Sequence, residues 1–165
     1  MPVEPPVNDL AQLQDRPEIA RLVGWSREAV PGAKFDRNEL SIYIARDAIR
    51  EACAILRDTP ELAYNFMADL TCVDWYPSEP RFEVIYHLLS IGRKQRVRLK
   101  VQLAAADARL ESVTSVWPSA NYFEREVFDL FGIHFDGHPY LRRLMMPEDW
   151  QGHPLRKDYP VEGYR

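Results

Sequence analysis

The sequence predicts an α+β protein: a single domain with a largely antiparallel sheet packed with helices, followed by an extended, irregular C-terminal tail. Three observations support this fold class. Three consecutive segments in the middle of the chain have the residue pattern of strands and are joined by short turns. Helical patterns precede and follow these segments. The last part of the chain contains so many prolines and glycines that neither a helix nor a strand can continue through it.

Size and composition fit one folded domain. The chain has 165 residues, and 46% of them are hydrophobic, which suffices for a substantial core. The formal net charge of -4 argues against a general nucleic-acid binder. No apolar stretch approaches the roughly 20 residues of a membrane-spanning helix, and the N-terminus lacks the pattern of a secretion signal. We therefore expect a soluble cytoplasmic chain in which Cys53 and Cys72 are small hydrophobic residues.

The first part of the chain is expected to form short helices and a strand. Residues 1-8 contain three prolines and no periodicity, which indicates a loose or partner-bound arm. A short helix or two should follow, interrupted at Pro17. Residues 39–44 alternate between polar and apolar side chains and predict a strand. Asp47 is then expected to cap a helix that reaches about Leu56.

The middle of the chain predicts three strands, over residues 66–75, 81–91 and 96–101. Pro77 to Pro80 supply the turn between the first two of these strands. Because the strands are consecutive and the turns are short, we expect them to pair antiparallel.

The third of these strands lies in a strongly basic stretch with five cations in eight residues: Arg93, Lys94, Arg96, Arg98 and Lys100. Alternation places the last three on one face of the strand. A nucleic-acid strip is disfavoured because no aromatic residue is interleaved for base stacking. The favoured interpretation is a solvated sheet face that is guarded against edge pairing. The alternative is a surface that docks onto an acidic neighbour.

A helix that ends before Gly132 has one apolar and one charged side. Counting about 100° per residue places Glu124 inside the apolar arc, between Phe128 and Phe131. The charged side carries Arg125, Glu126 and Asp129. Acid–base catalysis would need two carboxylates that face each other across a substrate. Acids grouped around an arginine on one helix favour an ion-pair network instead.

A buried Glu124 needs a partner, because an unpaired buried carboxylate is costly. One candidate is a capping box, in which Asn121 is the N-cap residue of the helix. The other is a tail arginine, Arg142 or Arg143, folded back over the helix.

Neither a metal site nor a cofactor site is predicted. His134 and His138 are four residues apart, but Gly132 ends the helix before them, so they cannot share a helical face. Two cysteines are too few for an iron–sulfur cluster, and the scattered glycines form no phosphate-binding loop. His138 and His153 each precede a proline, and we expect their imidazoles to fix turns by hydrogen bonds to the backbone.

The C-terminal segment is predicted to bind a partner, since its backbone cannot be satisfied by regular structure. The side chains expected to contribute are charged or aromatic: His138, Arg142, Arg143, Trp150, His153, Arg156, Lys157, Asp158 and Tyr159. The expected organisation is therefore an arm over residues 1-8, an α+β domain over residues 9-133 and a tail over residues 134-165. This organisation is typical of an assembly component.

The run from Ser119 to Pro160 resembles the family of the C subunit of respiratory complex I, the proton-pumping NADH:quinone oxidoreductase. The resemblance rests on five motifs: Glu124-Arg125-Glu126, Asp129-Leu130-Phe131-Gly132-Ile133, Gly137-His138-Pro139, Leu141-Arg142-Arg143 and His153-Pro154-Leu155-Arg156-Lys157-Asp158-Tyr159-Pro160.

The resemblance implies an α+β domain with a mixed sheet and an extended tail, without a redox centre of its own. FMN, iron–sulfur clusters and quinone would be bound by partner subunits. The chain would belong to a translocase at the cytoplasmic face of the inner membrane, against the D subunit, which carries the quinone site, and near the iron–sulfur B and I subunits. It would be inactive when isolated. Two alternatives remain: the equivalent subunit of a membrane-bound hydrogenase or ferredoxin-driven relative, and a free-standing binding module.

Overall fold

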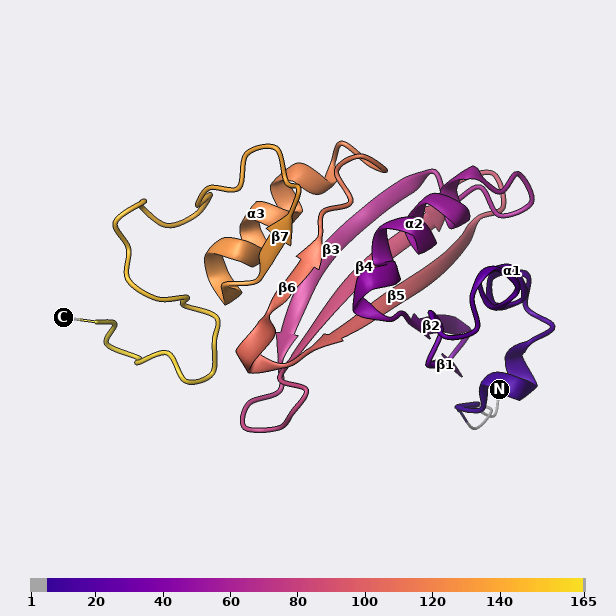
Figure 1. Cartoon of the computed structure of the whole chain (residues 1–165), viewed down its shortest axis with the longest axis horizontal. Coiled ribbons are helices and arrows are strands. Elements are labelled where there is room, and N and C mark those ends of the chain that lie inside the picture. The colour runs from indigo at the N-terminus through magenta and orange to yellow at the C-terminus, as the bar shows by residue number, and fades with distance from the viewer. Residues whose placement is uncertain (1–5, 165) are drawn as a thin grey trace.

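The structure, a computed structural model, describes residues 6–164 of the chain. It confirms the predicted α+β class, with a mixed five-stranded sheet and helices packed with it (Figure 1). The helices, 3-10 turns (η) and strands follow in this order: η1 (Leu10–Leu13), α1 (Pro17–Trp25), β1 (Gly32–Asp36), β2 (Glu39–Tyr43), η2 (Arg46–Ala48), α2 (Ile49–Asp58), β3 (Phe66–Asp74), β4 (Phe82–Ser90), β5 (Gln95–Leu103), η3 (Ala105–Asp107), β6 (Arg109–Glu111), α3 (Ala120–Phe131) and β7 (His134–Asp136).

The main sheet has the strand order β1-β2-β5-β4-β3. The three strands predicted in the middle of the chain are β3, β4 and β5, and they pair antiparallel as expected. β2 runs parallel to β5 and makes the sheet mixed. The sequence pattern does not predict β1, because only Ala33 is fully buried in this short strand and no alternation is visible.

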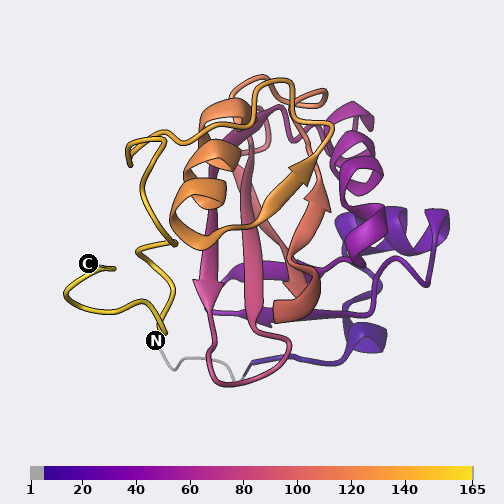
Figure 2. The same cartoon turned by 60° about the vertical axis from the view of Figure 1, so that its left-hand side comes forward.

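One face of the sheet is covered by α2 and α3, with β6 and β7 between them (Figures 1 and 2). The buried stripe of α2 consists of Ile49, Ala52, Cys53 and Leu56, and it joins the same core as the inward-facing residues of β4 and β5. Cys72 on β3 is buried in this core as well. Both cysteines therefore have the packing role expected of them.

The short helices expected near the N-terminus are η1 and α1, and the break between them falls just before Pro17, which begins α1 because the first helical position needs no backbone N–H. One local expectation in this half is wrong. Asp47 does not cap α2: a 3-10 turn precedes this helix, and Ala48 is its N-cap residue. The Asp47 carboxylate instead accepts a hydrogen bond of 3.0 Å from Arg46 Nε.

The predicted N-terminal arm falls partly outside the described residues, since residues 1–5 are not covered. Val7 is attached to the domain by two backbone hydrogen bonds with Phe35, of 2.9 and 2.8 Å. At the other end, residues 134–136 form β7, which pairs parallel with β6 and buries Phe135 in the core. This part of the predicted tail therefore belongs to the sheet structure, because pairing with β6 satisfies its backbone.

The basic strand alternates as predicted, but its expected role in guarding an edge is wrong. β5 lies inside the sheet between β2 and β4, so it has no free edge. Arg98 forms an ion pair with Glu39 of β2, and Lys100 pairs with Glu83 of β4 at 2.7 Å. Both cations thus help to join neighbouring strands on the face opposite the buried Val97, Leu99 and Val101.

Candidate interaction site

The tail is anchored to α3 by a buried carboxylate, Asp129. Asp129 Oδ1 accepts a hydrogen bond of 2.6 Å from Arg143. Its Oδ2 accepts three more, of 2.9, 2.7 and 2.9 Å, from the backbone N–H groups of Leu144, Met145 and Met146. The side chain is fully buried. Asp129 lies on the side of the helix opposite the apolar arc, and it is buried there because the tail covers that side.

The electrostatics of this anchor favour the charged form of Asp129. Burial alone would raise the pKa of this carboxyl, but the hydrogen bonds from the three amides and from Arg143 outweigh it and hold the pKa below its usual range. A carboxylate with this many donors is a strong, directional connector.

Two arginines extend the anchor along the tail. Arg143 Nη2 donates to the carbonyl oxygens of Trp150 and Gly152, at 2.9 and 3.0 Å, so one guanidinium connects α3 with two later parts of the tail. Arg125, on α3 itself, donates to the carbonyl oxygens of Arg142 and Arg143, at 3.1 and 3.0 Å. The predicted ion-pair network among the acids of this helix is wrong, because its arginine binds tail carbonyls.

Glu124 is fully buried, as its helical position predicts. It accepts hydrogen bonds from Ser112 Oγ, at 2.6 Å, and from the Val113 N–H, at 2.7 Å. Neither predicted partner is correct. α3 begins at Ala120 with Ser119 as its N-cap residue, so a capping box through Asn121 does not form. Burial, opposed by these two hydrogen bonds, raises the pKa of Glu124 to about 7.

The two histidines that precede prolines bind backbone groups, as predicted. Tyr140 N–H donates to His138 Nδ1 at 3.0 Å, so the other nitrogen, Nε2, carries the proton toward the Asn121 carbonyl at 3.1 Å. His138 Nε2 also lies 3.9 Å from Glu124 Oε2. His153 Nδ1 contacts the Asp129 carbonyl at 2.9 Å. Burial lowers the pKa of both imidazoles.

A second anchor joins the end of the tail to the β3–β4 hairpin. Arg81 donates two hydrogen bonds to Asp74, of 2.9 and 2.8 Å, and two to Asp158, of 2.9 and 2.6 Å. The Lys157 N–H also donates to Asp74. Burial opposes ionisation of Asp74, but Arg81 and the backbone N–H groups of Lys157 and Tyr76 lower its pKa to about 2. No local pattern predicts that Asp74 and Arg81 bind the tail, since Lys157 and Asp158 lie far along the chain.

The other predicted interface residues take varied positions. Arg156 Nε donates to the Phe131 carbonyl at 2.6 Å and so binds the C-terminal end of α3. The Tyr159 ring packs edge-on against Tyr164. Lys157 has an exposed side chain, and Glu126 is half-buried on α3. Within residues 6–164, no hydrogen bond connects Glu126 with the anchors.

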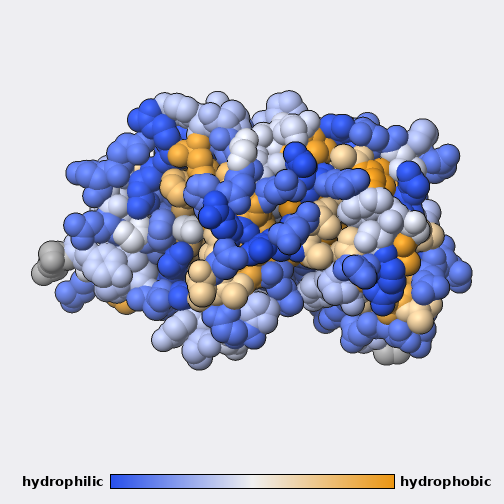
Figure 3. Space-filling view, viewed as in Figure 1, coloured by the Kyte–Doolittle hydropathy of each residue, from blue (hydrophilic) through white to orange (hydrophobic). Residues whose placement is uncertain are grey.

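The outer surface of α3 and the tail exposes large apolar side chains. These are Tyr122, Tyr140, Leu144, Met145, Trp150, Leu155, Val161 and Tyr164. Of the twelve exposed large hydrophobic residues in the described part of the chain, these eight follow the start of α3. Figure 3 shows the molecule from the side of α2 and α3, where the surface is mostly hydrophilic with several small, separate hydrophobic areas. Exposed aromatic and methionine side chains beside arginines are typical of protein–protein contacts.

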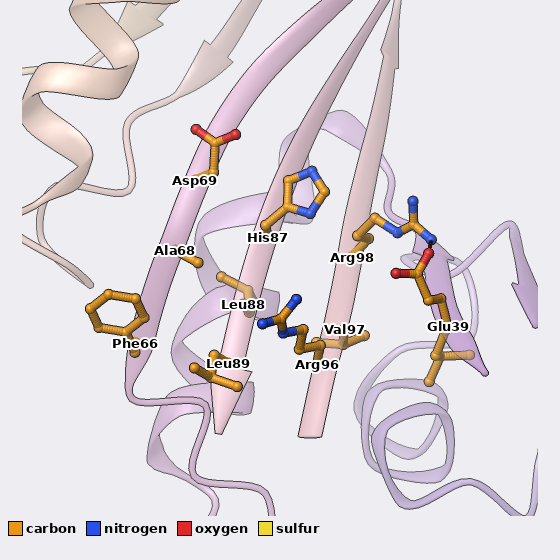
Figure 4. Close-up of a pocket in the computed structure, with 11 residues that line it drawn as sticks. Glu39, Phe66, Ala68, Asp69, His87, Leu88, Leu89, Arg96, Val97 and Arg98 are labelled. Carbon is orange, nitrogen blue, oxygen red and sulfur yellow. Dashed lines mark hydrogen bonds and ion pairs between the residues drawn. The ribbon is translucent and has the colours of Figure 1, made fainter. Parts of the chain in front are cut away.

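A separate groove of about 360 Å³ lies on the face of the sheet opposite α2. Figure 4 shows its charged residues, with Asp69 and His87 on neighbouring strands and Arg98 turned toward Glu39. Phe66 lines its apolar end. Burial lowers the pKa of His87. In the described residues, no group of three or more His, Cys, Asp or Glu side chains could hold a metal ion, and no helix is long and apolar enough to cross a membrane.

The fold and the site define a class of protein: an α+β domain whose C-terminal segment is anchored by two buried carboxylates, one on its last helix and one at the end of β3. The chain belongs to the 30 kDa subunit family of respiratory-chain NADH dehydrogenase, whose family model matches residues 42–165. The match includes most of the sheet and the whole tail, and it confirms the resemblance found in residues 119–160.

Curated relatives match over most of their length. The chain is 48% identical over 148 residues to the C subunit of the NADH-quinone oxidoreductase of Roseiflexus castenholzii, and the match covers 89% of this chain and 85% of that protein. The corresponding C subunit of Geobacter sulfurreducens is 48% identical over 128 residues, covering 77% of this chain and 78% of that protein.

Two solved structures are similar as well. The trypsin-resistant fragment (1-134) of Nqo5 is 33% identical with a TM-score of 0.63, covering 75% of this chain and 99% of the fragment. A chain of the membrane-bound sulfane sulfur reductase, an archaeal respiratory membrane complex, is 26% identical with a TM-score of 0.71, covering 87% of this chain and 85% of that chain.

Proposed function

We propose that this chain is the C subunit of a proton-translocating NADH:quinone oxidoreductase and that its role is structural. The observation that carries the proposal is the anchored tail. The buried carboxylates of Asp129 and Asp74 fix its backbone on the domain, while its apolar side chains remain exposed. A pre-ordered surface of this kind lowers the entropic cost of binding a partner.

The proposed partners are the quinone-site D subunit and the iron–sulfur B and I subunits, on the cytoplasmic side of the membrane. The names of the relatives at 48% identity support an NADH:quinone oxidoreductase. The alternative is a related complex with another electron donor. The archaeal reductase chain, at 26% identity, supports this alternative, but less strongly. Partner identification separates the two, because a flavin subunit accompanies NADH oxidation whereas nickel ligands in the D-like partner accompany a hydrogenase.

We propose further that FMN, the iron–sulfur clusters and quinone are bound by partner subunits and that the isolated chain is inactive. A thiolate is needed to ligate iron. Burial raises the pKa of Cys53 far above its usual value, and burial also raises the pKa of Cys72 to about 12. Both thiols therefore stay protonated inside the core.

The experiment is to purify this chain through a tag from cells that express it and to identify what accompanies it. The expected result is co-purification of the neighbouring subunits, with NADH:quinone reductase activity only in that fraction. The chain alone should show neither visible absorbance nor NADH oxidation. A monodisperse monomer without partners would support a free-standing binding module instead. A stoichiometric flavin or cluster in the pure chain would contradict the proposed absence of cofactors.

A further inference from the structure

A basic cleft lies at the end of the molecule that carries α1. Its volume is about 470 Å³, and it is bordered by the start of α1, the β1–β2 turn and the β4–β5 turn. Five cations from these three segments line it: Arg16, Arg37, Arg93, Lys94 and Arg96. The chain as a whole is acidic, with a net charge of -4, so this lining differs in sign from the overall charge.

The two carboxylates that line the cleft are already engaged. Glu18 is buried and accepts hydrogen bonds from Tyr64 Oη, at 2.8 Å, and from Arg93, at 3.0 Å. Glu39 pairs with Arg98 of β5. Neither acid is therefore available to the remaining cations.

Three cations of the cleft keep their charge unpaired. Arg37, Lys94 and Arg96 are exposed, and within residues 6–164 none of them forms an ion pair with a carboxylate. Arg16 lies with its guanidinium 3.5 Å from the centre of the Phe35 ring. In a cleft lined by charges of one sign, the low dielectric constant of the protein walls strengthens the electrostatic potential.

The basic cleft continues into the groove on the open face of the sheet. Both hollows share Glu39, Leu40 and Arg96. Beyond Arg96 the lining becomes apolar, with the exposed Phe66 and the half-buried Leu89 (Figure 4). The combined surface therefore offers positive charge at one end and an apolar contact at the other.

We propose that this surface binds an extended acidic segment of a neighbouring subunit, with Asp or Glu side chains at Arg37, Lys94 and Arg96 and an apolar side chain on Phe66. The proposal rests on the proposed function, because it assumes the assembled complex. Guanidinium groups bind carboxylates in a bidentate manner. An anionic bilayer fits less well, since the surface is concave and the whole chain is acidic. A nucleic acid fits less well, because bases stack on aromatic rings that are interleaved with the cations: Phe35 is covered by Arg16, and the exposed Phe66 lies at the apolar end, away from the unpaired cations.

The first test is crosslinking in the assembled complex. A photoreactive phenylalanine analogue replaces Gln95, which is exposed at the cleft, or as a control Gln102, which is exposed near the other end of β5. We expect the Gln95 variant to form an adduct with a peptide of a neighbouring subunit rich in Asp and Glu, and the Gln102 variant not to label that peptide. Adducts with lipid, with nucleic acid, with a non-acidic peptide or with nothing would overturn the proposal. So would labelling of the same peptide from both positions.

The second test removes the unpaired charges. Combined Arg37→Gln, Lys94→Gln and Arg96→Gln should weaken retention of the chain in the complex about tenfold and reduce its sensitivity to salt. The control combines Arg21→Gln, Arg50→Gln and Arg109→Gln, which removes the same charge from exposed sites elsewhere. Equal losses in both variants would overturn the proposal.

The two proposals fail in different ways. If no subunit accompanies even the unmodified chain, the proposed function is wrong. If subunits accompany the chain but both tests of the basic cleft fail, only the proposed binding of an acidic segment is wrong.

Discussion

Asp129 and Glu124 are both fully buried on α3, but their surroundings have opposite effects. Asp129 meets a guanidinium and three amide donors, so its charged form is stabilised and its pKa is lowered. Glu124 meets one hydroxyl and one amide, which do not compensate for burial, and its pKa rises to about 7. The first carboxylate is therefore a permanent anchor, and the second titrates near neutral pH.

The anchor can be tested with Asp129→Asn, which keeps the shape of the side chain but replaces one acceptor oxygen with an NH₂ donor. This donor would face the amides of the tail or Arg143, so we expect the free energy of unfolding to fall by about 2–4 kcal/mol. The measurement is urea denaturation of the isolated chain. Glu126→Gln on the same helix is the control and should change the stability by less than about 0.5 kcal/mol. Similar losses in both variants would contradict the anchor.

The raised pKa of Glu124 predicts that the stability difference between the wild type and Glu124→Gln depends on pH. Its folded pKa, about 7, lies above the unfolded value of about 4.3. Folding therefore favours the protonated form, and its contribution to stability is greatest below pH 4.3 and declines as the pH rises to 7. Glu124→Gln resembles the protonated acid at every pH. The free energy of unfolding of the variant, relative to that of the wild type, should therefore be higher at pH 8 than at pH 4, by roughly 4 kcal/mol at most.

This difference is measured by urea denaturation of both proteins at several pH values. His138 and His153 titrate in the same range with the opposite sign, because burial lowers the pKa of each imidazole in the folded state. Subtracting the two curves removes most of their contribution, although His138 lies 3.9 Å from Glu124 and is coupled to it. A difference that stays constant between pH 4 and 8 would refute the raised pKa.

Burial of Glu124 could be predicted from the sequence, whereas that of Asp129 could not. The apolar arc of α3 follows from the period of the helix alone, and Glu124 lies within it. Asp129 is buried by residues 143–146 of the tail, which the helical period does not describe. The donors to Glu124 come from the loop after β6 for the same reason: local patterns indicate that a partner is needed but not which distant segment supplies it.

At the level of elements, Gly132 controls how α3 meets the tail. It ends the helix in the left-handed region, with φ of 75°. A Cβ atom there would lie 2.5 Å from His153 Nε2 and 2.6 Å from Arg156 Nη2. Glycine is therefore needed both for the backbone conformation and for the close approach of two tail side chains.

Gly132→Ala should destabilise the chain and release the tail, whereas Gly137→Ala should do only the former. Gly137 has a similar φ of 79°, but open space surrounds the position of its Cβ. In both variants the strained backbone should lower the free energy of unfolding by about 1 kcal/mol. In Gly132→Ala the clash with the tail side chains should lower it further. Limited trypsin digestion measures the release, because Arg156 is half-buried against the end of α3 and becomes accessible when the tail leaves it. Equal cleavage rates in the two variants would show that close packing at Gly132 does not hold the tail.

Strands with a clear alternating pattern were predictable, including the five-residue β2, whereas β1 and the three-residue β7 were not. β3, β4 and β5 are nine residues each, and β4 and β5 alternate along most of their length. β7 has three residues and exists because β6 pairs with it, so its sequence resembles the irregular tail that follows. The parallel pairing of β2 with β5 likewise depends on a contact between segments that are far apart in the sequence.

At the scale of the whole molecule, two kinds of contact surface occupy opposite ends of the long axis (Figure 1). The exposed apolar side chains gather on α3 and the tail, and the unpaired cations gather beside α1. Composition predicts only the totals of both kinds of residue. Their separation follows from the strand order of the sheet, which places the β1–β2 hairpin at the edge away from β3 and α3.

This arrangement predicts that Arg142→Glu impairs assembly rather than folding or chemistry. Arg142 is exposed beside the apolar tail surface, and its side chain contacts Tyr140 and Glu148. The structural control is Arg109→Glu, whose arginine is equally exposed and also pairs with an acid, Asp136. Both variants should keep the wild-type unfolding midpoint, because exposed ion pairs contribute little to stability.

Only Arg142→Glu should reduce the abundance of the complex on native gels, roughly tenfold, since a reversed charge at a contact repels the group that the arginine attracted. Each complex that does assemble should retain near-normal quinone-reductase turnover. Normal abundance with lost turnover would place Arg142 in the chemistry and overturn a structural role for the tail.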